Sequence, residues 1–206
     1  METPHPGMCE MQASSLYTRR VLWLWILLGV AAVAIALYVL GYNRLVRLRN
    51  ELDPGWSNID VQLQRRGDLI PNLVEAVRAY AAHERAVFES VTEARTALQH
   101  ASSPGEAADA NDVLTSALGR LFAVAEAYPE LKASQNFLRL QDDLTDTEDK
   151  ISAARRYYNS TVMHYNTGIQ SIPWVLVATP LGFRAREFFS ASGDTDVPQV
   201  SFTPAT

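Results

Sequence analysis

Residues 21–42 form an uninterrupted apolar run, VLWLWILLGVAAVAIALYVLGY, without one charged side chain. At about 1.5 Å per residue, a helix of this length spans roughly 33 Å, which is enough for the hydrocarbon core of a bilayer. Aromatic rings prefer the membrane interface, and four lie toward the two ends of the run: Trp23, Trp25, Tyr38 and Tyr42. The pattern therefore predicts one transmembrane helix.

A cleaved signal peptide is the alternative interpretation of this run, because Ala34-Ile35-Ala36 resembles a cleavage site. The apolar stretch, however, is longer than the core of a typical signal peptide and continues past that motif. No cysteine follows it, which argues against a lipoprotein anchor. We therefore expect an uncleaved single-pass protein.

More arginines follow the run than precede it. Arg19 and Arg20 stand before it, and those after it are Arg44, Arg47, Arg49, Arg65 and Arg66. Basic residues beside a membrane span favour the cytoplasmic side. We expect the N-terminus outside, and the rest of the chain in the cytoplasm at the inner (cytoplasmic) membrane of the cell.

From residue 43 to about 189 the apolar residues recur every three or four positions, which is typical of amphipathic helices. Asp53-Pro54-Gly55 interrupts the first stripe: either Asp53 caps a new helix, or one continuous helix kinks there. The stripe keeps its phase, so we favour the kink. A second break is expected at Asp68–Pro71, because proline disfavours a helical residue before it.

Three further helices are expected. The second runs from Pro71 to about Leu98, and the third from the loop 101–105 to Tyr128-Pro129. The fourth, from about Leu131 to Ile172, has apolar residues spaced by seven, which predicts coiled-coil-like packing: Phe137, Leu144, Ile151, Tyr158, Tyr165 and Ile172. In an antiparallel arrangement, so long a fourth helix would return to the membrane surface or overhang the bundle.

The fold class predicted from these patterns is all-α: an N-terminal transmembrane helix followed by an elongated antiparallel bundle of about four helices. The expected domains are a short tail (1–20), the transmembrane helix (21–42), the bundle (43–189) and a disordered C-terminal tail (190–206), which is rich in Asp, Thr, Pro and Ser.

Composition narrows the function classes. The 18 basic and 23 acidic residues give a net charge of −5, which argues against a nucleic-acid-binding protein. Cys9 is the one cysteine in the sequence, which excludes a disulfide framework and a multi-cysteine metal site. Hydrophobic residues make up 48% of the chain, enough to bury a core.

Several segments resemble the LemA family. The longest is WSNIDVQLQRRGDLIPNLV, residues 56–74, and the others include YAAHE at 80–84, VTEAR at 91–95, YPELKA at 128–133 and NFLRLQ at 136–141. The resemblance covers roughly residues 21–189 and implies an N-terminal membrane anchor and a cytoplasmic helical domain. It implies no reaction. Asp53-Pro54-Gly55 departs from the family pattern, which usually has helix-compatible residues there.

Glu84 stands inside an apolar stripe, where an unpaired carboxylate would be costly to bury. We expect a structural ion pair with Arg65, Arg66 or Arg155. The alternative is a metal or proton-transfer site at His83 and Glu84, although neither H-E-x-x-H nor a paired Glu-x-x-His occurs. We expect no catalytic residue, metal ligand or cofactor.

The segment after the fourth helix combines apolar residues 172–178, including Trp174, with Arg184 and Arg186. This composition suits contact with lipid headgroups; the alternative, slightly favoured, is a segment that caps the bundle end. On the fourth helix the amides Asn136, Asn159 and Asn166 would fix the packing register or form a binding face.

These patterns together indicate a non-enzymatic scaffold or adaptor that presents a helical surface near the membrane. The expected partners are the lipid bilayer, unidentified proteins and a further copy of the chain, but not nucleic acid. One alternative is a membrane-shaping or oligomeric structural protein. Another is an enzyme with a site around His83 and Glu84.

Overall fold

The computed structural model describes residues 7–191, with side chains from Arg19 onward. Within this range all secondary structure is helical, as predicted. The helices are α1 (Gly7–Asn50), α2 (Leu52–Arg78), α3 (Arg85–His100), α4 (Pro104–Glu126), α5 (Pro129–Lys132), α6 (Gln135–Gln170) and α7 (Val175–Ala178). Most of the expected tail at 1–20 precedes the first described side chain. Most of the expected tail at 190–206 lies outside the described residues.

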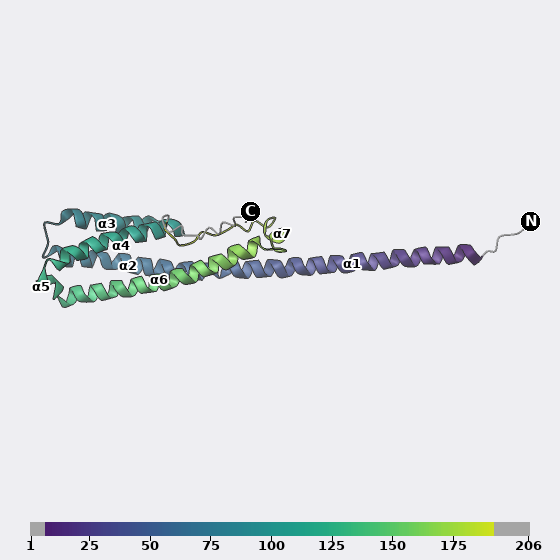
Figure 1. Ribbon diagram of the computed structural model, residues 1–206, viewed down its shortest axis with the longest axis horizontal. Helices are drawn as coiled ribbons and strands as arrows, with labels where there is room; N and C mark the ends of the chain where they lie inside the picture. Colours follow the sequence, from purple (N-terminus) through teal and green to yellow (C-terminus); the bar gives the residue numbers. More distant parts are fainter. Residues whose placement is uncertain (1–6, 192–206) are drawn as a thin grey trace, which may run out of the picture.

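Helices α1 and α2 form one rod, and α1 projects far beyond the packed helices (Figure 1). Only Glu51 separates them; its backbone is still right-handed helical, and its N–H donates to the carbonyl of Arg47 at 3.1 Å. Pro54 sits in the first turn of α2, where its missing N–H is harmless. This arrangement matches the continuous-helix alternative rather than a helix newly capped at Asp53.

The packed part consists of two helix pairs. α2 lies along α6, α3 lies against α4, and the two pairs share one apolar core (Figure 1). α3 and α4 have 16 and 23 residues, whereas α6 has 36. The shorter pair therefore covers only part of α6 and leaves the portion nearest α1 to be covered by another segment.

The predicted break at Asp68–Pro71 is wrong, because α2 continues through Pro71 to Arg78. Proline at this position removes the N–H that would bond to the carbonyl of Gly67. The Nε of Arg95 on α3 donates to that carbonyl instead, at 2.8 Å. A partner from another helix thus satisfies the backbone group that the proline leaves free.

The actual break comes at residues 79–84, inside the stretch expected to be one helix from Pro71 to Leu98. The remaining boundaries differ from the predictions by a few residues: α4 begins at Pro104, inside the loop expected at 101–105, and α6 begins at Gln135 rather than near Leu131, after the short helix α5. The seven-residue series is buried from Phe137 to Tyr165, but Ile172 lies beyond α6 and is 85% exposed.

α6 returns to the end of α1, as its length suggested. Gly168 near the end of α6 lies against Leu45 and Leu48 of α1, and a Cβ at Gly168 would come within 3.0 Å of Leu48. A larger residue there would press on the Leu48 side chain, so the two helices pack closely at this point. The end of α6 therefore lies beside the end of the apolar run.

Candidate functional site

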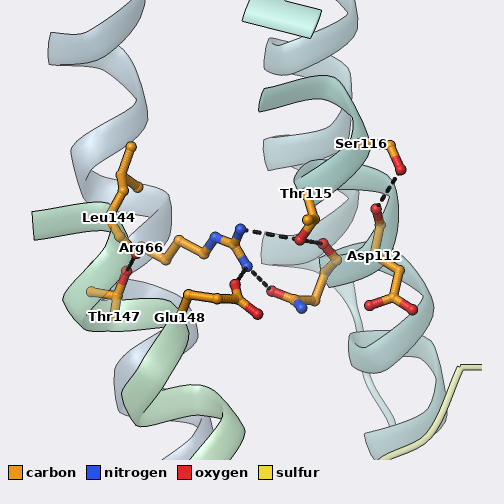
Figure 2. A network of polar contacts seen from close by, with 8 residues as sticks. Arg66, Asp112, Thr115, Ser116, Leu144, Thr147 and Glu148 are labelled. Atoms are coloured by element: carbon orange, nitrogen blue, oxygen red, sulfur yellow. Dashed lines mark hydrogen bonds and ion pairs between the residues drawn. The ribbon is translucent and has the colours of Figure 1, made fainter. Parts of the chain in front are cut away.

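Arg66 of α2 is the centre of a polar network inside the bundle (Figure 2). Its guanidinium donates to Asn111 Oδ1 at 2.6 Å and to Thr115 Oγ1 at 3.1 Å, both on α4, and forms an ion pair with Glu148 of α6 at 2.5 Å. The Arg66 side chain is 5% exposed and that of Glu148 is 41% exposed. One side chain thus links three helices.

Burial lowers the pKa of Arg66, and the negative charges of Glu148 and Asp112 oppose that shift. Arginine remains protonated under all ordinary conditions, so the network holds a permanent buried cation. A buried cation with a carboxylate and two neutral acceptors is a structural arrangement that specifies how α2, α4 and α6 align.

The structure does not place Glu84 in a buried ion pair. Glu84 precedes α3 and is exposed in the break between α2 and α3, next to the exposed His83. The expectation is wrong because it assumed an unbroken helix through this position. Instead, the ion-pair partner of Arg66 is Glu148, and the partner of the exposed Arg65 is Asp146 at 3.8 Å.

Arg155, the third arginine expected beside Glu84, is half-buried on α6 and has an interaction of its own. A groove of about 600 Å³ lies next to the α2–α3 break, and its lining includes Arg78, Arg85 and Phe88 but neither His83 nor Glu84. Among the described residues, no three His, Cys, Asp or Glu side chains are grouped as metal ligands would be.

Trp174 joins the C-terminal segment to the end of the apolar run. Its ring lies directly over Gly41 of α1, where a Cβ would come within 2.5 Å, and the guanidinium of Arg44 stands 5.8 Å from the ring centre. The ring of Phe183 packs edge-on against Tyr42 at 6.3 Å. The segment therefore covers the end of the bundle, which agrees with the capping alternative.

The same segment also exposes apolar side chains. Ile172 is 85% exposed and Leu176 is 74% exposed, while Val177 and Ala178 face the core. α7 is the element of the bundle that lies farthest along the direction in which α1 projects (Figure 1). Capping and lipid contact are therefore compatible, because one face packs on α1 and another is open.

Residues 184–191, which we term the strap, run from α7 back along α6 without regular secondary structure. Asn166 accepts a hydrogen bond from the N–H of Arg186 at 2.8 Å and donates to its carbonyl at 2.9 Å. Asn159 forms the same pair of bonds with Phe189. Two of the three candidate amides thus bind the strap, whereas Asn136 is exposed.

Phe189 anchors the strap in the core. It is 1% exposed and its ring lies 6.3 Å from that of Trp56. Tyr158 donates its hydroxyl to the carbonyl of Glu187 at 3.1 Å, and burial raises the pKa of this tyrosine. The strap therefore covers the part of α6 that the shorter helices α3 and α4 leave open. Arg184 and Arg186 on the strap are both exposed.

The sequence pattern predicted neither the strap nor the buried network around Arg66. The strap has no periodicity of its own, and its only sequence signal is the seven-residue spacing of Asn159 and Asn166. Arg66 was one of three arginines expected as the partner of Glu84, and Glu148 received no role in an ion pair, because nothing in the sequence shows which helices become neighbours.

Comparison with known proteins assigns the sequence to a family. The sequence model of the LemA family matches residues 55–202. Magnetosome protein MamQ 2 of Paramagnetospirillum magneticum is 28% identical over 193 residues, covering 81% of this chain and 71% of that protein. Protein LemA of Metamycoplasma hominis is 29% identical over 159 residues, covering 75% and 71%. Magnetosome protein MamQ of Magnetospirillum gryphiswaldense is 26% identical over 209 residues, covering 85% and 77%.

The family match extends over most of the chain and includes α2, the helix pair α3–α4, α6 and the strap. The match therefore covers segments that resemble the family in sequence and also the helices of the observed bundle. The chain belongs to the LemA family.

Proposed function

We propose that this chain is a single-pass membrane protein whose helical bundle acts as a non-enzymatic scaffold at the membrane surface. The observation that carries the proposal is the continuous rod of α1 and α2. Residues 19–78 form a helix that is long and apolar enough to cross a membrane, and its apolar part is almost entirely unburied. The large apolar side chains from Leu22 to Tyr42 are 43–69% exposed, and such a surface is stable in lipid but not in water.

The orientation follows from charge. Arg44, Arg47 and Arg49 succeed the apolar run directly, and Arg19 and Arg20 precede it. The excess on the C-terminal side favours a bundle in the cytoplasm and an N-terminus outside. Because the rod enters the bundle without a flexible linker, the membrane anchor also fixes the direction in which the bundle extends.

A scaffold is favoured over an enzyme because the candidate reactive pair, His83 and Glu84, is exposed and does not line the groove beside the α2–α3 break. A scaffold needs only a rigid surface, and membrane attachment raises its effective concentration toward partners in the same membrane. The partners on this account are the bilayer and cytoplasmic or membrane proteins that contact the helices.

A membrane-shaping or oligomeric structural role is a second candidate, favoured by the exposed Ile172 and Leu176 beside the end of the span. Two measurements separate the scaffold from the structural role: sedimentation of the full chain in detergent, and the shape of vesicles that contain it. A monomer or dimer that leaves vesicle shape unchanged supports the scaffold, and a large assembly that deforms vesicles supports the structural role.

The test of the scaffold is crosslinking in membranes followed by recovery of the full chain. We expect the same crosslinked proteins with the wild type and with the double variant His83→Ala, Glu84→Ala, because the pair is remote from the core. Full membrane retention in alkaline carbonate is expected for both. Loss of all crosslinked proteins in the double variant, or release of the wild type by carbonate, would contradict the proposal.

A further inference from the structure

The end of the bundle beside the apolar run is basic, although the whole chain is acidic. Residues 41–51 and 171–191 contain two glutamates, Glu51 and Glu187, and five arginines. The arginines, all exposed, are Arg44, Arg47, Arg49, Arg184 and Arg186. These two segments therefore carry a net charge of +3, against −5 for the chain as a whole.

Three of these arginines line one groove of about 340 Å³. Arg49 comes from α1, Tyr165 from α6, and residues 182–186 complete the lining with Arg184 and Arg186. Gly182 has a left-handed backbone (φ 73°), which a residue with a side chain rarely adopts, and it turns the chain from α7 toward the strap. The side chain of Asn166 then holds Arg186 in place by binding both the N–H and the carbonyl of Arg186.

The charges converge on the groove and have no counterion in it. Burial raises the pKa of Tyr165, and the charges of Arg186 and Arg49 oppose that rise, so both guanidiniums act on the same hydroxyl. Within residues 19–191 no ion pair involves Arg49, Arg184 or Arg186. A groove with three uncompensated guanidiniums favours an anion.

The groove lies beside the end of the apolar run, so that on the proposed membrane attachment its arginine side chains can reach the lipid headgroups. Phe183, which lines it, contacts Tyr42 at the end of the apolar run. Arg49 follows Gly41 by eight residues, about 12 Å along the helix, and a headgroup layer is roughly 5–8 Å thick on each side of the hydrocarbon. Long arginine side chains extend toward that layer. Ile172 and Leu176 are exposed at the same end.

We propose that the groove formed by Arg49, Tyr165, Arg184 and Arg186 binds the phosphate of an anionic phospholipid in the membrane that holds α1. The guanidinium fork matches phosphate oxygens in pairs, and basic pockets beside membrane spans suit anionic headgroups. The site rests on the proposed membrane attachment. Its effect is to hold the start of the strap and the end of α6 near the bilayer, so that the bundle has one fixed orientation.

The test uses the full-length chain in detergent and native mass spectrometry with phosphatidylglycerol or phosphatidylcholine. The variant Arg49→Gln, Arg184→Gln, Arg186→Gln removes the three charges of the groove. The matched control, Arg85→Gln, Arg120→Gln, Arg139→Gln, removes three exposed charges at the other end of the bundle. Circular dichroism confirms equal helix content in the two variants.

We expect the wild type to prefer phosphatidylglycerol to phosphatidylcholine. The groove variant should lose about a hundredfold in affinity for phosphatidylglycerol, at about fivefold for each arginine, and the control should keep the wild-type affinity. Equal losses in both variants would show general charge attraction and overturn the site. Inorganic phosphate that binds as tightly as the lipid would show a soluble-anion site and overturn the lipid assignment.

Membrane sedimentation separates this inference from the proposed function. The groove variant should remain in the membrane fraction, because α1 is unchanged. If it remains there with undiminished phosphatidylglycerol affinity, the headgroup site is wrong and the membrane scaffold stands. If the wild type is itself found outside the membrane fraction, the proposed function fails first.

Discussion

Asn159 binds the backbone of Phe189 in both directions: its carbonyl oxygen accepts the N–H at 2.9 Å, and its amide donates to the carbonyl at 3.0 Å. Asn166, two helical turns later, binds Arg186 in the same way. Two turns of α-helix rise about 10.5 Å, and three residues of extended chain cover about 10 Å. The strap therefore matches α6 in register without forming a strand.

Asn159→Ala should destabilise the bundle by about 1–3 kcal/mol, because it leaves a backbone N–H and a carbonyl near the core without partners. Chemical denaturation of the full chain in detergent measures the change. Asn136→Ala, an exposed position on the same helix, is the control and should stay within about 0.5 kcal/mol of wild type. A change at Asn159 as small as that at Asn136 would mean that the bonds between Asn159 and Phe189 contribute no stability.

The Arg66–Glu148 pair should respond asymmetrically to substitution. Glu148→Gln leaves a guanidinium that is 5% exposed without its counterion, and we expect a loss of about 3 kcal/mol. Arg66→Met leaves a carboxylate that is 41% exposed and accessible to water, so the loss should be smaller, about 1–2 kcal/mol.

Arg65→Met is the control for this pair. Arg65 lies 3.8 Å from Asp146 and both side chains are 46% exposed, so the change should be below about 0.5 kcal/mol. Thermal or chemical unfolding of the three variants measures the loss of stability in each and so ranks them. A greater loss for Arg66→Met than for Glu148→Gln would contradict the assignment of Arg66 as the buried member.

Gly41→Ala should detach the segment around Trp174 from α1, because the added Cβ overlaps the indole ring at 2.5 Å. Crowding of this kind costs about 1–3 kcal/mol, so amide exchange of residues 171–183 should accelerate about tenfold or more. Gly29→Ala has nothing within 4 Å of the new Cβ and is the matched control. Unchanged exchange in Gly41→Ala would exclude the observed contact.

The start of α4 should give the protein an acid-dependent stability. Glu106 accepts hydrogen bonds from the N–H and the hydroxyl of Ser102 at 2.8 and 2.7 Å, which lower the pKa of its carboxyl below the ordinary 4.5. The folded pKa is below the unfolded one, so the stabilisation is complete above pH 4.5 and is lost as the pH falls through the folded value.

Unfolding of the full chain as a function of pH checks this sign. Glu106→Gln should lower stability at neutral pH and flatten the acid side of the profile, and Ser102→Ala should have a smaller effect in the same direction. A wild-type profile that rises as the pH falls below 4.5 would contradict the direction of the shift.

The fold was largely predictable because helix periodicity is a local property. The spacing from Phe137 to Tyr165 identified the buried face of α6, and the loop expected at 101–105 placed the start of α4 to within two residues. Pro71 misled the prediction, because its effect is offset by Arg95, which binds the carbonyl of Gly67 from 28 residues away in the sequence. The break at 79–84 consists mainly of residues that favour helices and has no local signal.

The candidate sites were less predictable because they depend on contacts between distant segments. Arg66 meets Glu148 only after α2 and α6 pack together. The basic groove combines Arg49 with Arg184 and Arg186, although Arg49 is more than a hundred residues from the other two in the chain. The sequence indicated the membrane-facing composition of Arg184 and Arg186 but not the groove that they form with Tyr165.

The most direct test of the membrane topology labels cysteines from one side of the membrane. Cys9, the one cysteine of the sequence, stands before the apolar run, and Ala82 is exposed at the other end of the bundle. Intact spheroplasts that express the wild type, or the variant Cys9→Ser with Ala82→Cys, are treated with a membrane-impermeant maleimide. The account predicts labelling at residue 9 before lysis and at residue 82 only after lysis; labelling of residue 82 in intact spheroplasts would contradict it.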